Sequence, residues 1–241
     1  MSVHPVLDAV DVVIFDKDGT LISFEAMWVG WARELGGRLE AATRRPVAGD
    51  VFATIGFDPT VDRVIPGGPL AIATMDGIRD LVGAVLRRWC PSVPAAQRIL
   101  ADAWYEPDPV ATAVPLADLG AVLGALRDAG RRIAVATTDD RRPTQATLAG
   151  LGIAHLVDDV VCGDDRGPTK PDPDAIRAIA VRLGTTAART AMVGDTPADL
   201  RMGRVAGAVT VGVTSGVTGA AELEPLADVV LGSIRELLTE P

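Results

Sequence analysis

The chain has 241 residues, 48% of them hydrophobic, which is enough for one large domain or for a core domain with a smaller inserted one. Its formal net charge of −9 argues against a general nucleic-acid surface, because a polyanion is bound through a basic stripe. Cys90 and Cys162 stand far apart without a CxxC or Cys/His cluster, so neither a disulfide framework nor a zinc site is indicated. No apolar run reaches about 18 residues, and we expect a cytoplasmic protein without a membrane partner.

Short runs rich in β-branched residues recur along the chain, and each is followed by an amphipathic stretch of helical length. This alternation predicts an α/β fold, a Rossmann-like parallel sheet with helices on both faces. The expected strands are Asp11–Phe15, Arg132–Thr137, Asp158–Cys162, Thr190–Val193, Thr210–Val213 and Asp228–Leu231. The clearest helices are Leu116–Ala129, Pro173–Leu183 and Pro197–Val205, and each ends at or near a glycine.

The pattern changes between residues 23 and 108, where helical spacing continues without convincing strands. Phe24, Met27, Trp28, Trp31 and Leu35 fall on one helical face. The sequence therefore predicts a core domain made of residues 1–22 and 109–241, interrupted by a helical domain at residues 23–108.

The first expected strand runs directly into Asp16-Lys17-Asp18-Gly19-Thr20-Leu21. In extended backbone a period of two puts the carboxylates of Asp16 and Asp18 on one side and Lys17 on the other. Two carboxylates so close attract a hard cation. An EF-hand calcium loop is the structural alternative, but its glycine stands sixth and its glutamate twelfth, whereas here glycine is fourth and the twelfth residue is Met27.

Three later strand ends carry further candidates. Thr137 and Thr138 close the second strand, where open α/β sheets bind ligands, although threonines are also common turn and cap residues. Lys170 stands just before a helix that Asp172 should cap and Pro173 should begin, so it suits an anion, or else it is a solvated loop residue. Only Lys17 and Lys170 are lysines, against 21 arginines, which suggests a need for a compact point charge.

The fourth strand end, Gly194-Asp195-Thr196-Pro197-Ala198-Asp199, combines a free carboxylate with a helix start. Thr196 is the expected N-cap, Pro197 the first helical residue and Asp199 the third residue of a capping box. Capping accounts for Asp199 as structure and leaves a direct site role open. It does not account for Asp195, which fits a metal-binding group.

These stretches, in this order, resemble the haloacid dehalogenase-like (HAD) superfamily: DKDGT at 16–20, Thr137, Lys170 in KPDP, and GDTPAD at 194–199. The inserted helical segment resembles the C1 cap of that superfamily, and the stretch Ala206–Gly216 resembles its phosphoglycolate-phosphatase-like members. Thr138 stands where many relatives have asparagine.

The resemblance implies a magnesium-dependent phosphatase acting on a small phosphomonoester. Asp16 would be the nucleophile that becomes a phosphoaspartate, and Asp18 the general acid and base. Thr137, Thr138 and Lys170 would hold the phosphoryl group, with Asp199 in support. Mg²⁺ would bind Asp16, the backbone carbonyl of Asp18, and Asp195.

Two other functions stay open at this point. A phosphomutase shares every motif and differs in returning the phosphoryl group to its substrate, and a binding module could retain the fold without turnover. The expected partner is a small-molecule phosphate ester, with no nucleic acid, and the expected assembly is a monomer or homodimer.

Overall fold

The computed structural model describes residues 2–239, which form two compact units. The core unit consists of the chain up to Phe24 and from Pro109 onward, and the helical unit is Glu25–Asp108. The sequence-based division falls after residues 22 and 108.

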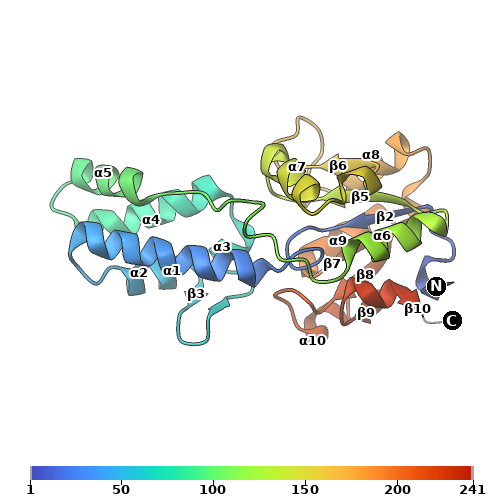
Figure 1. The fold of residues 1–241 in the computed structure, drawn as a ribbon, viewed down its shortest axis with the longest axis horizontal. Coiled ribbons are helices and arrows are strands. Elements are labelled where there is room, and N and C mark those ends of the chain that lie inside the picture. The colour runs from blue at the N-terminus through green and yellow to red at the C-terminus, as the bar shows by residue number, and fades with distance from the viewer. Residues whose placement is uncertain (1, 240–241) are drawn as a thin grey trace. The chain divides into compact units, whose positions relative to one another are not determined.

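The core unit is built on six parallel strands in the order β6-β5-β2-β7-β8-β9 (Figure 1). Every strand expected from the sequence is present, with ends that differ by at most one residue, and the α/β fold class is confirmed. The strands are β2 (Val12–Phe15), β5 (Arg132–Ala136), β6 (Asp159–Val161), β7 (Thr190–Gly194), β8 (Val209–Val213) and β9 (Val229–Leu231).

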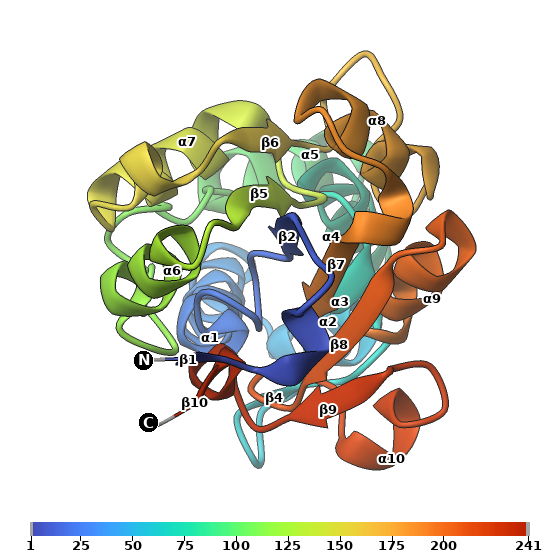
Figure 2. The same cartoon turned by 90° about the vertical axis from the view of Figure 1, so that its right-hand side faces the viewer.

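Helices cover both faces of this sheet, with α6 and α7 on one face and α8 and α9 on the other (Figure 2). Alternate residues of β2 therefore serve two cores: Val12 and Ile14 pack with Ile176 and Met202 of the second pair of helices. Because the central strands are apolar on both faces, all four β2 side chains are buried. The helices are α6 (Leu119–Asp128), α7 (Arg141–Gly150), α8 (Asp174–Arg182), α9 (Pro197–Ala206) and the single turn α10 (Ala220–Leu223).

Capping determines where these helices start. The side chain of Asp118 accepts a hydrogen bond from Ala121 N, so α6 begins at Leu119 and not at the predicted Leu116. The prediction for α8 was also slightly wrong: its N-cap is Pro173, while the Asp172 carboxylate accepts from Asp174 N at 2.9 Å. At α9 the capping box of Thr196 and Asp199 is present as expected.

The helical unit contains α1 (Phe24–Thr43, which starts one residue inside the core unit), α2 (Ala48–Ile55), α3 (Pro69–Ile72), α4 (Met75–Trp89) and α5 (Val93–Ala103). A short hairpin, β3 (Phe57–Asp58) with β4 (Arg63–Val64), departs from the expectation of helices alone. Strands of two residues are too short to produce a period-two pattern in the sequence. In the unit's interior Gly36 lies against the ring of Phe52, whereas the next glycine, Gly37, is exposed.

Two short strands, β1 (Ser2–Val3) and β10 (Leu238–Thr239), form a separate antiparallel pair beside the main sheet. Within residues 2–239 we find no helix with the length and apolar character needed to cross a membrane.

Candidate active site

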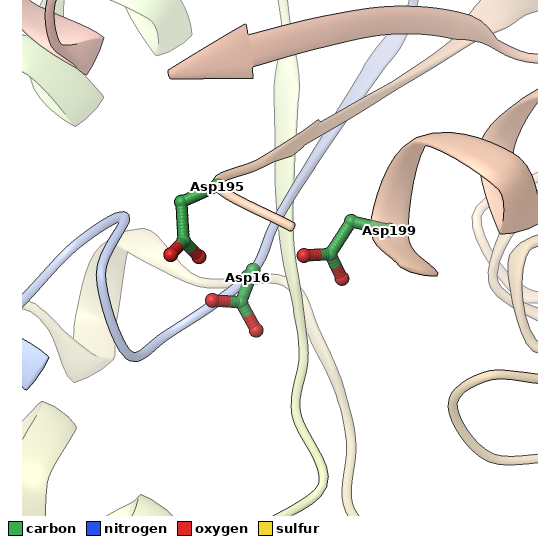
Figure 3. Close-up of side chains that lie close together, drawn as sticks. All are labelled: Asp16, Asp195 and Asp199. Carbon is green, nitrogen blue, oxygen red and sulfur yellow. The ribbon is translucent and has the colours of Figure 1, made fainter. Parts of the chain in front are cut away.

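Two adjacent strands deliver aspartates to the same edge of the sheet. In the parallel register Phe15 of β2 pairs with Val193 of β7, and Asp16 N donates to Val193 O at 2.8 Å. Asp16 and Asp195 therefore leave the sheet side by side, and Asp199 joins them from the first turn of α9. Ligand atoms of the three carboxylates lie within 4.8 Å of one another, and the side chains converge (Figure 3). All three residues are buried.

Lys170 is the cation that accompanies this acidic cluster. Its Nζ lies 2.5 Å from Asp16 Oδ1 and 2.5 Å from Asp199 Oδ1, and only 8% of its side chain is exposed. The alternative of a solvated loop lysine is therefore excluded. A buried ammonium is costly unless it is paired, and here two carboxylates pair it.

Asp199 contacts both the start of α9 and Lys170. Its Oδ2 accepts hydrogen bonds from Thr196 N and Thr196 Oγ1, which completes the cap of α9. Its Oδ1 faces Lys170. Since both oxygens are engaged, Asp199 acts on the site chiefly by holding Lys170, and Asp16 and Asp195 remain the better candidates for metal ligands.

The loop after β8 encloses Asp195. Val217 N donates to Asp195 Oδ2 at 2.9 Å, while Asp195 Oδ1 is buried with no hydrogen-bond partner among the described residues. A Cβ added to Gly19 or Gly216 would overlap the Asp195 carboxylate, so both positions require glycine. Ser215 Oγ also donates to Gly19 O, which ties this loop to the turn after Asp16. In the sequence this loop stands out only through the family resemblance of Ala206–Gly216, because no sequence pattern reveals which backbone approaches a carboxylate.

The electrostatics of the cluster favour a bound cation. Burial raises the pKa of Asp16 well above its usual range, and Asp199, Asp195 and Asp18 add to that effect against the opposing charge of Lys170. Burial and Asp199 raise the pKa of Asp195 to about 7. Three buried carboxylates with one lysine leave excess negative charge, and carboxylate oxygens are the ligands that hard cations prefer. The residues present therefore fit a divalent metal, with the unpartnered Oδ1 of Asp195 as one ligand.

Asp18 is not one of the three carboxylates whose ligand atoms lie within 4.8 Å of one another, although its charge raises the pKa of Asp16. The expectation that Lys17 points away from Asp18 was wrong: the chain bends at Lys17, and Lys17 Nζ lies 2.6 Å from Asp18 Oδ2 and 3.0 Å from Asp139 Oδ2. The contribution of the Asp18 backbone carbonyl to a metal site stays a prediction. The pairing of Lys17 with two carboxylates was missed, although the scarcity of lysine pointed to it as much as to Lys170.

Thr137 and Thr138 lie where β5 ends, at the same edge of the sheet as Asp16. Thr137 is buried, and its Oγ1 accepts a hydrogen bond from Asp139 N at 3.2 Å. Thr138 is exposed. Because β5 pairs directly with β2, a phosphoryl group at Asp16 would meet this strand end.

Comparison with known proteins agrees with this arrangement. Residues 10–207 match the family described as haloacid dehalogenase-like hydrolase. A phosphoglycolate phosphatase of Rhodospirillum rubrum is 34% identical over 204 residues, which cover 85% of this chain and 79% of that protein. The pyrophosphatase PpaX of Bacillus velezensis is 36% identical over 119 residues, 48% of this chain and 54% of that protein.

The fold is also found among solved structures. That of a predicted phosphoglycolate phosphatase from Haemophilus somnus superposes with a TM-score of 0.66 at 18% identity, covering 96% of this chain and 97% of that one. At this identity the likeness concerns the fold alone.

Proposed function

The chain belongs to the haloacid dehalogenase-like hydrolase family and is a phosphatase of that family, and we propose that it hydrolyses a small phosphomonoester through a phosphoaspartate formed on Asp16, with Mg²⁺ as cofactor. The observation that carries this proposal is the buried cluster of Asp16, Asp195 and Asp199 around Lys170, at the edge of the sheet where parallel α/β folds bind their ligands.

In the proposed reaction the Asp16 carboxylate attacks phosphorus in line with the departing ester oxygen. The P–O bond to the leaving group breaks, and Asp18 gives that oxygen a proton. Asp18 then takes a proton from a water molecule, which attacks phosphorus. The bond to Asp16 breaks, inorganic phosphate leaves, and the aspartate is regenerated.

Lys170 would neutralise the phosphoryl oxygens, together with Thr137 or Thr138 at the end of β5. Asp16 and Asp195, with the Asp18 carbonyl, would hold Mg²⁺. The metal supplies positive charge that lets an anionic ester approach a cluster of carboxylates. Asp199 supports the site through Lys170.

The substrate that we propose first is phosphoglycolate, because the relative from Rhodospirillum rubrum that bears this name matches most of the chain. The shorter match to a pyrophosphatase leaves other small phosphate compounds as alternatives. We also propose that the helical unit is the cap that selects among them, and that the enzyme acts in the cytoplasm as a monomer or homodimer.

A substrate screen in the presence of Mg²⁺ tests the activity. Phosphoglycolate, sugar phosphates, nucleotides and pyrophosphate should be compared by release of inorganic phosphate. A phosphomutase would instead convert a sugar phosphate into its isomer with little phosphate released. A catalytically silent protein would release none from any compound.

The covalent step has its own test. Rapid acid quenching during turnover, followed by peptide mass analysis, should find a phosphoryl adduct on the peptide that contains Asp16. Asp16→Asn should abolish the adduct and the turnover while the fold is retained, because the amide has the same size but lacks the nucleophilic charge. Substantial activity in this variant, checked for deamidation, would replace the covalent route with direct attack by water.

Metal dependence completes the test of the site. Exhaustive EDTA treatment should abolish turnover, and added Mg²⁺ should restore it. Undiminished activity after chelation would refute the assignment of Asp16 and Asp195 as metal ligands.

A further inference from the structure

Lys17 is a buried cation that the proposed reaction does not use. Its side chain is 1% exposed, although lysine usually lies at the surface. Nζ donates to Asp18 Oδ1 at 2.8 Å, lies 2.6 Å from Asp18 Oδ2, and lies 3.0 Å from Asp139 Oδ2. The ammonium therefore bridges the carboxylate proposed as general acid and base to a carboxylate at the end of β5.

The backbone on both sides of this bridge is fixed. Leu21 N and Ile22 N both donate to Lys17 O, at 2.9 and 3.0 Å, and Gly19 supplies the positive φ of 88° that closes the turn. Asp139 is held in turn, because its N–H donates to Thr137 Oγ1 and its carbonyl accepts from Gly163 N. Asp18 is thus attached, through Lys17, to a rigid strand end.

The stability of the fold alone does not explain why Lys17 is buried between two carboxylates. Replacing a buried ion pair by apolar residues of similar volume is often neutral or stabilising, since burial of the charges costs as much as their attraction returns. Burial opposes the charged form here too, but Asp18 and Asp139 outweigh it and raise the pKa of Lys17. The ammonium nevertheless lies 2.6 Å from the carboxylate proposed as general acid and base and 3.0 Å from Asp139, so the pair occupies one defined arrangement.

We propose that Lys17 is a positioning residue for Asp18, and that together with Asp139 it holds the Asp18 carboxyl in the place from which it reaches the leaving oxygen. The inference rests on the proposed role of Asp18. It concerns the location of that carboxyl group, because general acid catalysis requires hydrogen-bond reach, and a carboxyl group on a free turn would sample many rotamers.

The test compares esters that need the general acid to different degrees. A 4-nitrophenyl ester leaves without protonation, whereas an alkyl ester depends on it. We expect Lys17→Met to lower kcat/KM for the best alkyl phosphate by about 10-fold to 100-fold, and for 4-nitrophenyl phosphate by about threefold or less. Lys17→Arg, which keeps the charge, should recover part of the loss. If Lys17→Met lowers kcat/KM equally for both esters, or lowers it for neither, the proposal is overturned.

Two further variants serve as a control and as a substitute for Lys17→Met. Arg189→Met removes the partner of Asp11 at the opposite end of β2 and should leave the ratio between the esters unchanged. If Lys17→Met does not fold, as judged by circular dichroism, Asp139→Asn decides: a change in the ratio of about threefold or more supports the proposal, and an unchanged ratio overturns it.

Asp18→Asn separates this inference from the function on which it depends. It should affect the alkyl ester far more than the aryl ester. Equal losses in this variant would refute the acid role of Asp18 and the inference with it. If Asp18→Asn lowers kcat/KM for the alkyl ester much more than for the aryl ester, while Lys17→Met and Asp139→Asn do not change the ratio between the esters, only the role of Lys17 is overturned.

Discussion

Substituting Gly216 by alanine tests whether the loop after β8 determines the position of Asp195. The added Cβ would overlap the Oδ2, Cγ and Cβ atoms of that side chain, whereas ordinary contacts begin near 3.4 Å. Either the loop or the carboxylate must therefore move by about 1 Å. The movement would also disturb the hydrogen bond that Val217 N donates to Asp195 Oδ2. In the described part of the chain, Asp195 Oδ1 has no hydrogen-bond partner in any case.

The consequence should appear in metal dependence. Groups that orient a metal ligand typically contribute about 10-fold to 100-fold in affinity, and a displacement of about 1 Å at a reacting centre costs up to ~10²-fold in rate. We expect the Mg²⁺ concentration for half-maximal hydrolysis to rise by about 10-fold or more, and kcat/KM at saturating Mg²⁺ to fall. Both are measured in one titration of phosphate release against free Mg²⁺.

Gly219→Ala is the matched control. Gly219 follows in the same loop with an ordinary φ of −78°, and an added Cβ there would meet nothing within 4 Å. The control should behave as the wild type. A folded Gly216→Ala variant with the metal dependence and rate of the wild type would refute the view that this loop positions Asp195.

Three other predictions have defined outcomes. Lys170→Met leaves the buried carboxylates of Asp16 and Asp199 without their cation. Turnover should fall by about 10²-fold or more, and urea denaturation should show that the free energy of unfolding is lower by about 3–5 kcal/mol. Turnover within tenfold of wild type would contradict the role of Lys170. Asp165→Asn removes the ion pair with Arg141, whose hydrogen bonds lower the pKa of Asp165. The ion pair should stabilise the fold by about 1 kcal/mol above the unfolded pKa of about 3.9, and this stabilisation is lost as the pH falls through the lower folded pKa. The difference in Tm between wild type and variant should therefore vanish in acid. A difference that persists there would contradict the pairing. Gly36→Ala should lower Tm because its Cβ would press on a buried ring. The exposed Gly37→Ala should raise Tm, because alanine stabilises a helix by about 0.5–1 kcal/mol relative to glycine; equal effects would contradict the packing.

The sheet could be predicted from the sequence because its signal is local. Apolar runs such as Val12–Phe15 and Arg132–Ala136 are buried on both faces, and each ends at a polar turn. The cap of α9 was equally readable, since Thr196, Pro197 and Asp199 stand at fixed offsets. In contrast, a two-residue hairpin such as β3 with β4 has no periodicity to detect.

The sequence predicted which residues gather at the candidate site better than it predicted the contacts between their side chains. The clustering of Asp16 with Asp195 follows from strand ends at one edge of a parallel sheet. That Lys170 pairs with Asp199 as well as Asp16, and that Lys17 reaches Asp139, depends on side-chain directions after the backbone bends. Alternation predicts that Lys17 points away from Asp18, whereas the two side chains pair, because the chain bends at Lys17 and a period of two holds only while the chain stays extended.

The position of β2 in the sheet sets the order in which a nascent chain could become active. The strand that carries Asp16 is synthesised well before both of its neighbours, because Val12 pairs with Arg132 and with Thr190. The helical unit emerges from the ribosome before either neighbour, so it can fold while β2 still lacks both partners. Because Asp195 follows β7 and its enclosing loop follows β8, the acidic cluster is completed and enclosed only after β8 has been translated. A nascent chain that stops before β8 therefore lacks the loop that holds Asp195 in place.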